Sequence, residues 1–452
     1  MTAPAFIEES SDSIRWRRYL KYKPSGVEWL GDVPIDWIVL TTKRLFNVVN
    51  GSTPKSTEME YWEGDIPWVT PEDLGKSKQD TIFDSQRMIT SKGYMSCGTS
   101  LVPEGSLIIS TRAPIGYIKI ANREMCTNQG CKSLVFKISQ EDRDRKFFYY
   151  LYYTCKPELE SWGQGATFKE LANSKLENIL IVKPPLPEQH AIAAFLDRET
   201  ARIDDLIAKK ERQIELRQEK RSALISQAVT KGLDPNAKMK DSGIEWLGMV
   251  PEHWDLVSIR GLLVQRYEFN IGPKTENILS VVRNVGVINY EERSAAGNKK
   301  SENIEQYKII YPGDIVLNRM NIIIGSVGIS KEYGAASIEY YVLYPRDGSI
   351  DKNYYANLFC SKEFQESLKG IGTGILAHRL RISYDDLKKV KLPRPQKNEQ
   401  CQISAYLDIE NGHSNKLIMK IQESLDKLHE YRSAIISAAV IGKIDIQQDV
   451  LA

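Results

Sequence analysis

The stretch SGVEWLGDVPIDW, residues 25–37, returns with few changes as SGIEWLGMVPEHW at residues 242–254. Nine of the thirteen aligned positions are identical without a gap, and two tryptophans are among them. The paired tryptophans indicate packing anchors rather than binding residues. Such a match indicates an internal duplication, which has to be recognised before any fold is assigned.

A second match lies further along each half. It consists of a proline-rich turn, a Glu-Gln pair and two short helical motifs, which have the same order and spacing in both halves. The aligned segments are 176–185 with 387–395, Glu188-Gln189 with Glu399-Gln400, 195–197 with 406–408, and 221–223 with 432–434. The intervening stretches 46–170 and 263–380 differ much more. A shared frame with unlike filling predicts one architecture that carries two different surfaces.

Two long segments read as helices. Residues 188–231 contain no proline or glycine, and their apolar positions recur near a 3.5-residue spacing; residues 399–441 are similar, with Gly412 as the weak point. Because one apolar stripe cannot be buried alone, we expect the two helices to pair as an antiparallel coiled coil within the chain. The expected helix–helix core is Ile192, Leu196, Ile203, Leu206, Ile207, Ile214, Leu417, Ile421, Leu425, Leu428 and Ile435.

The parts outside these helices read as β-rich, so the predicted fold class is α+β: two β-rich domains separated by two long helices, with pseudo-twofold symmetry. Strand composition marks 106–111, 133–138, 314–317 and 340–344, while 146–155 and 354–369 read as helices before glycine-rich loops. The expected domains are an N-terminal extension 1–21, a first domain 22–187, a first helix 188–232, a second domain 233–398, a second helix 399–443 and a tail 444–452.

The composition excludes several classes of protein. The chain has 452 residues, 42% hydrophobic and 27% charged, with a net charge of +2, values ordinary for a globular protein. Six scattered cysteines form no CxxC pair and no zinc pattern, so we expect reduced thiols and no metal. There is no signal-peptide pattern and no run of about 18 apolar residues. We therefore expect a cytoplasmic protein that does not enter a membrane.

No catalytic motif is present. The sequence lacks GxxxxGK[ST], HExxH and GxSxG. It also lacks the Asn/Asp-Pro-Pro-aromatic motif of amino-group DNA methyltransferases, and Pro71–Lys76 has the wrong spacing for a metal-dependent nuclease. We therefore expect no catalytic residue in this chain, and a binding protein with two distinct surfaces.

DNA is a ligand that two such surfaces fit. Base edges are read mainly by Arg, Lys, Asn and Gln, and two half-sites on one face lie about 34–36 Å apart. The loops rich in these residues supply the candidates Arg112, Gln129, Gln164, Thr167, Asn318, Arg319, Asn321, Arg379 and Arg381. For the two arginines that follow strands, Arg112 and Arg319, the alternative is a surface or core-pairing role. For Gln164 and Thr167 the alternative is a plain tight turn.

These motifs resemble the specificity subunit of type I restriction–modification systems. The resemblance rests on the frame SGxEWLGxxPxxW, on the segments 51–54, 61–62 and 64–74, and on the PLPEQ ending at residue 189. In the second half it rests on 278–282, 286–288, 311–316 and 325–328, and it covers about residues 22 to 443. The first-half signature adds Thr53, Lys55 and Thr70 as candidate DNA contacts.

The resemblance implies a mechanism. Each domain would read one half of a split, asymmetric DNA site, while the helices set the gap and hold two modification subunits that methylate adenine at N6 after flipping it. Restriction subunits would then join to form an ATP-driven nuclease. The chain itself would bind no cofactor; S-adenosylmethionine, ATP and Mg²⁺ would be used by the partner subunits.

Two other classes of function stay open. One is an enzyme with nuclease or methyltransferase activity hidden in a domain, which predicts turnover by the purified chain given S-adenosylmethionine or magnesium. The other is a coiled-coil scaffold that does not touch DNA, which predicts no sequence-dependent retention of DNA.

Overall fold

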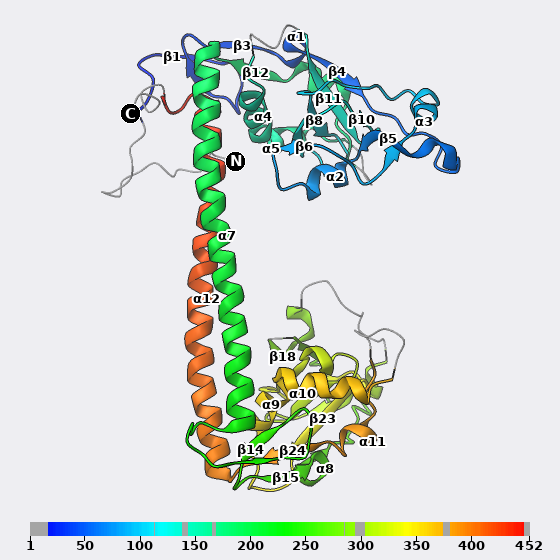
Figure 1. The fold of residues 1–452 in the computed structure, drawn as a ribbon, viewed down its shortest axis with the longest axis vertical. Helices are drawn as coiled ribbons and strands as arrows, with labels where there is room; N and C mark the ends of the chain where they lie inside the picture. Colours follow the sequence, from blue (N-terminus) through cyan, green and yellow to red (C-terminus); the bar gives the residue numbers. More distant parts are fainter. Residues whose placement is uncertain are drawn as a thin grey trace. The chain divides into compact units, whose positions relative to one another are not determined.

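The chain forms two compact units in the computed structural model. Unit 1 comprises Met1–Lys209 with Ser424–Ala452, and unit 2 comprises Lys210–Glu423. The described residues are 17–112, 114–137, 143–164, 169–283, 285–293, 303–373 and 380–446. The units cut across both long helices, whereas the sequence-based domain list treats each helix as a segment of its own. Figure 1 shows the elements along the chain.

The duplicated box forms the same hairpin in each unit. Strand β1 (Tyr22–Pro24) pairs antiparallel with β2 (Asp32–Pro34), and β13 (Met239–Asp241) pairs with β14 (Met249–Pro251). The second glycine of the box, Gly31 or Gly248, has φ of +63° or +61°, a conformation that favours glycine. The final tryptophans, Trp37 and Trp254, are fully buried. The box therefore repeats because it is a turn that ends in a core anchor.

Unit 1 is built on a five-stranded sheet, β4-β11-β8-β9-β6, beside a three-stranded sheet, β10-β5-β7, and a pair, β12-β3. Two expected strands, 106–111 and 133–138, fall on β8 and β11. The strands are β3 (Ile38–Thr41), β4 (Phe46–Asn50), β5 (Trp62–Val69), β6 (Thr81–Ile82), β7 (Met88–Ile89), β8 (Leu107–Ser110), β9 (Ile118–Ala121), β10 (Cys126–Thr127), β11 (Cys131–Phe136) and β12 (Leu180–Lys183). The short helices are α1 (Thr42–Leu45), α2 (Pro71–Lys76), α3 (Ser91–Met95), α4 (Arg145–Thr154), α5 (Lys156–Ser161) and α6 (Asn173–Asn178).

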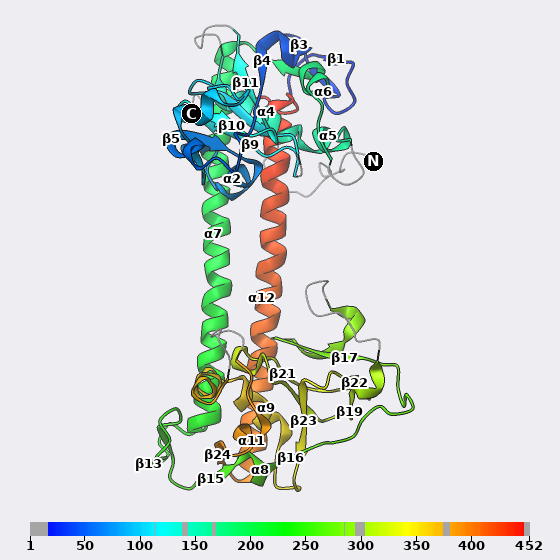
Figure 2. The same cartoon turned by 90° about the vertical axis from the view of Figure 1, so that its right-hand side faces the viewer.

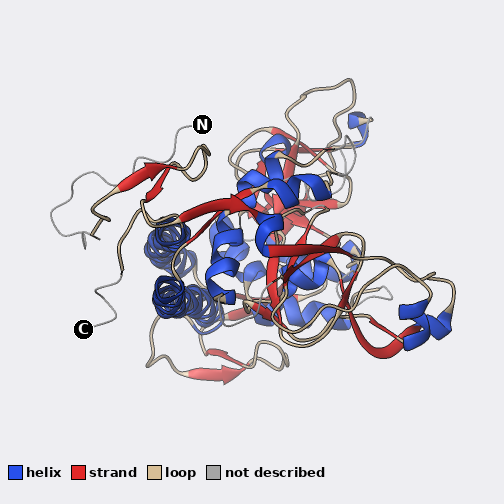
Figure 3. Ribbon diagram, turned by 90° about the horizontal axis from the view of Figure 1, so that it is seen from above, coloured by secondary structure: helices blue, strands red, loops and turns tan. Residues whose placement is uncertain are grey.

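Unit 2 repeats the centre of this plan with a smaller main sheet, of four strands instead of five. Its main sheet, β16-β23-β20-β21, matches β4-β11-β8-β9 in order, and β15-β24 matches β3-β12. The strands are β15 (Asp255–Ser258), β16 (Leu263–Gln265), β17 (Leu279–Val282), β18 (Gly286–Asn289), β19 (Lys308–Ile310), β20 (Ile315–Asn318), β21 (Val327–Ile329), β22 (Gly334–Ala336), β23 (Tyr340–Pro345) and β24 (Lys391–Arg394). The short helices are α8 (Ile259–Leu262), α9 (Lys352–Cys360), α10 (Lys362–Ser367) and α11 (Tyr384–Leu387), with a 3-10 turn at Ile322–Ile324. Figure 3 shows short strands in red together with short helices in blue outside the long helices.

The two long helices are α7 (Leu186–Lys231) and α12 (Lys397–Val440). Each starts two residues before its expected beginning, and α12 continues through Gly412 without a break. Within each unit, a part of α7 lies beside a part of α12, running in the opposite direction (Figures 1 and 2).

One polar contact between the helices occurs in both units. In unit 1, Arg432 donates to both carboxylate oxygens of Asp204, with distances of 2.8 and 3.1 Å. In unit 2, Arg221 donates to the side-chain oxygen of Asn415 at 3.1 Å. Asp204 and Asn415 are equivalent in the duplication, and so are Arg221 and Arg432. Both contacts therefore have the same antiparallel register.

The expected helix–helix core divides into three groups. The buried members are Ile192, Leu196, Ile203, Ile207, Leu425 and Ile435, and the half-buried members are Ile214, Ile421 and Leu428. Leu206 and Leu417 are instead 36% and 41% exposed, so their assignment to the core was wrong. Leu206 lies about 100° around the helix from Ile207, which puts it on the flank of the stripe.

The first turns of the long helices pack into the units rather than only against each other. Ile403 and Leu407, near the start of α12, belong to one core cluster with Trp254 and Tyr354. The duplication aligns them with Ile192 and Leu196. Each long helix therefore enters the core of a unit through its first turns.

A buried glutamine fixes each of these helix starts. Gln400 donates to the Pro395 carbonyl oxygen at 2.8 Å and accepts from the Asp351 N–H at 2.7 Å. Gln189 makes the equivalent contacts with Pro184 and Asp144, at 2.8 and 3.1 Å. Asp351 and Asp144 are the N-caps of α9 and α4. The Glu-Gln pair of the sequence therefore ties the helix start to the preceding turn and to a second helix.

The chain closes unit 1 differently from unit 2. In unit 2, residues 232–238 run directly from the end of α7 into β13. In unit 1, the end of α12 meets the segment before β1, where the Asp445 N–H donates to the Arg17 oxygen at 2.7 Å and the Tyr22 hydroxyl donates to the Gly442 oxygen at 3.1 Å. Two segments far apart in the sequence thus make the connection that one linker makes in unit 2.

Candidate nucleic-acid interface

In unit 1 the candidate side chains gather around the loop at residues 51–55. The indole N–H of Trp68 donates to the Ser52 oxygen at 2.8 Å, and that of Trp62 donates to the Lys55 oxygen at 3.2 Å. Arg87 lies 3.5 Å over the Trp62 ring. The two tryptophans therefore hold this loop from beneath, while Thr53 and Lys55 stay exposed on it.

This loop touches a second one that contains Gln129. The Thr53 hydroxyl donates to the Gln129 side-chain oxygen, and the Ser52 N–H donates to the Thr127 oxygen at 3.0 Å. A Cβ on Gly51 would lie 2.0 Å from the Asn128 oxygen, so only glycine allows this approach. Thr53 and Gln129, 76 residues apart, thereby form one exposed surface.

Arg112 extends the same surface. Its backbone N–H donates to the Gly130 oxygen at 3.2 Å, and its Nε lies 3.1 Å from the Glu170 carboxylate. Glu170 and Gln164 exchange two backbone hydrogen bonds, at 2.9 and 3.0 Å, which close the base of a loop. Thr167 belongs to that loop and lies outside the described residues. Thr53, Gln129, Arg112 and Gln164 therefore form one continuous strip, called strip 1 below.

Thr70 makes a structural contact. Its backbone N–H and hydroxyl both donate to Asp73, at 2.8 and 2.6 Å, in a capping box at the start of α2. The hydroxyl is therefore occupied by a structural contact. Pro71 at the first helical position supports the same interpretation. The structure thus places Thr70 beside strip 1 as a helix cap.

In unit 2 the candidates form a second group, called strip 2. Asn318, Arg319 and Asn321 lie in the turn after β20, where the Asn318 side chain accepts from the Met320 N–H at 3.0 Å. The Arg319 oxygen accepts from the Ile382 N–H at 3.2 Å, which brings the exposed Arg381 alongside. Arg381 and Thr373 exchange backbone hydrogen bonds at 2.8 and 3.0 Å. Arg379 lies outside the described residues.

The two strips occupy equivalent places, with one shift of position. Leu171 donates to the Thr111 oxygen in unit 1 as Ile382 donates to Arg319 in unit 2. The counterpart of Arg319 is therefore Thr111, so Arg112 and Arg319, which both follow strands, differ by one position in the duplication. Residue composition alone does not reveal that the turns after the two strands differ by one position. The loop-closing pair Gln164 and Glu170 matches Thr373 and Arg381.

Each strip contains an arginine–glutamate pair that the sequence did not reveal. Arg319 binds Glu339 through Nε at 2.5 Å and Nη2 at 2.7 Å, and this carboxylate raises the pKa of Arg319. Arg112 binds Glu170 through Nε. Both arginines remain partly exposed, with side-chain exposures of 42% for Arg112 and 32% for Arg319.

A buried lysine accompanies each pair. The pKa of Lys308 is lowered to about 8, first by burial and then by the charge of Arg319, against the opposing effect of Glu339. Burial also lowers the pKa of Lys132, with Glu170 raising it and Arg112 lowering it. The Lys308 ammonium donates to the Tyr340 oxygen at 2.6 Å, and that of Lys132 to the Asn50 side chain at 3.1 Å. In the sequence, the only sign of these two lysines is a polar residue that interrupts the apolar pattern of a strand.

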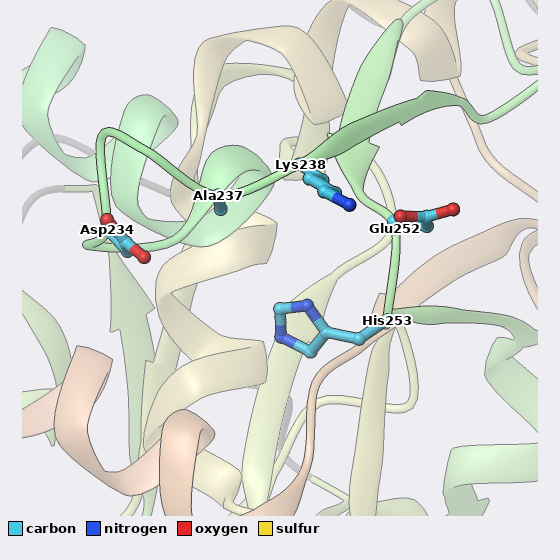
Figure 4. Close-up of a pocket in the computed structure, with 5 residues that line it drawn as sticks. All are labelled: Asp234, Ala237, Lys238, Glu252 and His253. Atoms are coloured by element: carbon cyan, nitrogen blue, oxygen red, sulfur yellow. The ribbon is translucent and has the colours of Figure 1, made fainter.

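A hollow in unit 2 lies away from strip 2. Its volume is about 480 Å³, and it is lined by Asp234, Ala237, Lys238, Glu252 and His253 (Figure 4). His253 pairs with Glu399 at 2.9 Å. Among the described residues no group of three or more His, Cys, Asp or Glu side chains could hold a metal ion. The hollow therefore shares no residue with strip 2.

A search of the described helices for membrane spans gave a negative result: none combines the length and apolar character needed to cross a bilayer.

A family model described as "Type I restriction modification DNA specificity domain" matches residues 34–216 and again 267–428. The MjaIX specificity subunit of Methanocaldococcus jannaschii is 36% identical over 208 residues, covering 45% of this chain and 45% of that protein. This chain thus spans less than half the length of that relative. The MjaVIII specificity subunit of the same organism is 26% identical over 434 residues, covering 92% of this chain and 94% of that protein.

A solved chain from work on complex assembly and conformational transition of the type I R-M system has a similar fold. Its TM-score is 0.64 at 16% identity, and the alignment covers 90% of this chain and 98% of that one. The likeness extends the family match to the fold of nearly the whole chain. Since the family model covers well over half of the sequence, in two separate regions, the chain belongs to the specificity-subunit family of type I restriction–modification systems.

Proposed function

We propose that this chain reads a split, asymmetric DNA site, with strip 1 reading one half and strip 2 the other. The observation that carries the proposal is the pairing of one duplicated scaffold with two unlike polar strips at equivalent places. Equivalent scaffolds present equivalent surfaces to a duplex, and unlike side chains read unlike bases.

Strips 1 and 2 have the chemistry of DNA readers. Their exposed groups are Thr53, Lys55, Gln129 and Gln164 in unit 1 and Arg381 in unit 2, and their half-buried groups are Arg112, Asn318, Arg319 and Asn321. Amide and guanidinium groups read base edges in the major groove, while threonine and lysine contact phosphates. Thr167 and Arg379 complete the proposed sets from loops outside the described residues.

In this proposal α7 and α12 form one antiparallel coiled coil that sets the gap between the half-sites. Support comes from the repeated contact of Asp204 with Arg432 and of Asn415 with Arg221, which has one register in both units. Buried Ile203, Ile207, Leu425 and Ile435 supply its apolar seam.

The helices also offer a surface for two modification subunits. Their exposed apolar side chains are Leu206, Leu216, Ile409, Leu417, Met419 and Tyr431. Leu206 and Leu417 are equivalent in the duplication, so two identical partners have a common anchor. Exposed apolar groups of this kind mark interaction sites when they gather on one element.

Catalysis belongs to the partners in this proposal. Modification subunits would use S-adenosylmethionine to methylate adenine, and restriction subunits would use ATP and Mg²⁺ for cleavage. The chain would supply recognition and assembly and bind no cofactor of its own. Purified alone, it should show no methylation and no cleavage.

The test maps N6-methyladenine across the host genome with and without this chain. We expect one split motif to disappear when the chain is removed. Exchanging residues 46–170 for another recognition domain should change one half of the motif and leave the other half and the gap intact. A change in both halves would contradict separate reading by the two units. Turnover by the purified chain, or unchanged methylation in its absence, would reject the function itself.

A further inference from the structure

The arginine–glutamate pairs share one feature: in each, a carboxylate lies at the Nε edge of the guanidinium, at 3.1 Å in Arg112–Glu170 and 2.5 Å in Arg319–Glu339. In Arg319 the same carboxylate also accepts one N–H of Nη2. Because the five donors lie in one rigid plane, a carboxylate at this edge leaves the outer N–H groups of Nη1 and Nη2 directed away from it. Arg319 also contacts the Tyr341 hydroxyl, which further restricts its orientation.

The pairs are built from residues that are not equivalent in the duplication. Glu170 closes the loop of unit 1, where its counterpart in unit 2 is Arg381. Glu339 instead precedes β23, and its counterpart is Gly130, which precedes β11. Inheritance from one ancestral unit would keep the partners at equivalent positions. The same kind of pair assembled from different positions indicates a shared demand on the two arginines.

The buried lysines add a second observation of this kind. Lys132 lies on β11 and is 7% exposed, whereas Lys308 lies on β19 and is 8% exposed. The glutamate of each pair raises the pKa of the neighbouring lysine and the arginine lowers it. A positive charge on the inner side of each pair therefore attracts the carboxylate that binds the arginine.

We propose that Glu170 and Glu339 are positioning residues that aim Arg112 and Arg319 at a guanine, one in each half-site. The proposal rests on the proposed function and adds to it the base that is read and the residue that orients the reader. Two terminal guanidinium nitrogens match the O6 and N7 acceptors of guanine in the major groove. The glutamate also cancels most of the arginine's charge, which weakens its attraction to any phosphate and leaves geometry to decide binding.

The experiment uses the full chain produced together with its modification subunit, with N6-methyladenine mapped by sequencing. The variants are Glu339→Gln, Glu339→Asp and Arg319→Lys in unit 2, and Glu170→Gln and Arg112→Lys in unit 1. The matched control is Glu215→Gln, which removes an exposed pair with Arg212 at 2.8 Å on α7. Melting temperatures are measured for every variant.

We expect the parent motif to contain a G·C pair in each half. Glu339→Gln and Arg319→Lys should relax one such position in one half by roughly ten-fold, the scale of one bidentate contact, while the other half stays unchanged. Glu339→Asp should restore part of the preference. The unit 1 variants should relax a position in the opposite half, and Glu215→Gln should leave the motif intact.

Three results would overturn the positioning role: an unchanged motif, an equal fall in methylation at all sites, or a relaxed position that is not G·C. An equal fall at all sites would mark a phosphate contact or a purely structural pair. Failure of the proposed function would look different, because the unaltered chain would then direct no split motif at all.

Discussion

At the scale of single residues, buried polar groups set the local structure. Gln189 and Gln400 are fully buried, and each satisfies a proline carbonyl and a helix-cap N–H. Lys132 and Lys308 are nearly buried cations whose burial costs free energy. Structure thus depends on a few hydrogen bonds that cannot be replaced by apolar packing.

Replacing Gln400 by leucine should destabilise the chain by about 2–3 kcal/mol, because the Asp351 N–H and the Pro395 carbonyl would be left unpaired in the core. Urea unfolding of the variant measures the loss. Gln402→Leu, at an exposed position of the same helix, should change stability by no more than about 0.5 kcal/mol. Equal effects at the two positions would show that the buried contacts contribute nothing.

Lys308 makes stability depend on pH. Its pKa is about 8 in the folded chain, below its ordinary value of 10.5, so the unfolded chain binds more protons between these two pH values. Stability contributed by this group therefore rises as pH increases from 8 to 10. Relative to Lys308→Met, the parent chain should gain about 1–2 kcal/mol over that interval. Urea unfolding of both proteins at about pH 7.5 and about pH 10 measures this gain. A stability difference between the two proteins that does not change with pH would contradict the prediction.

At the scale of elements, the helices were the most predictable feature and the strips the least. A long run with almost no proline or glycine and with a regular apolar spacing predicts a long helix, and α7 and α12 lie where such helices were expected. The flank position of Leu206 was missed because a period near 3.5 does not say how wide the buried stripe is. Glu170 and Glu339 were missed because their arginine partners come from elsewhere in the chain, and no local pattern records such a pairing.

The exposed leucines of the long helices test partner docking. Leu206→Glu and Leu417→Glu should each weaken the binding of one modification subunit, so native mass spectrometry should show one copy bound instead of two. The double variant should bind none. Ala208→Glu, on the other flank of α7, is the control and should keep both copies. Retention of two copies by the double variant would place docking elsewhere.

At the scale of the whole molecule, the duplication was predictable and the division into units was not. The matching stretches that begin at residues 25 and 242 indicate two copies, whereas the sequence-based division lists each long helix as a separate segment between the domains. The compact units instead each combine part of α7 with part of α12. Antiparallel contacts such as Asp204 with Arg432 join residues that are more than 200 positions apart, and sequence order conceals them.

Because the segments before β1 and after α12 meet in unit 1, we expect the chain to tolerate circular permutation. Joining residue 446 to residue 17 with a short linker, and cutting within 233–237, should give a chain that folds and directs the same methylation motif. A cut within the buried strand β8, between Ile108 and Ile109, should abolish folding. Circular dichroism and methylation mapping compare the two. Loss of the motif in the first variant alone would show that the connection at 232–238 has a role beyond linking.

The contact between Arg17 and Asp445 has a consequence for the gene. If the two domains and the two long helices follow one another as a closed cycle, the start codon marks one point on that cycle and not the beginning of a structural unit. Gene rearrangements that move this point would reverse the order in which the two recognition domains are translated. The DNA sequence that the finished protein reads would stay the same, so two genes of opposite domain order could encode one specificity.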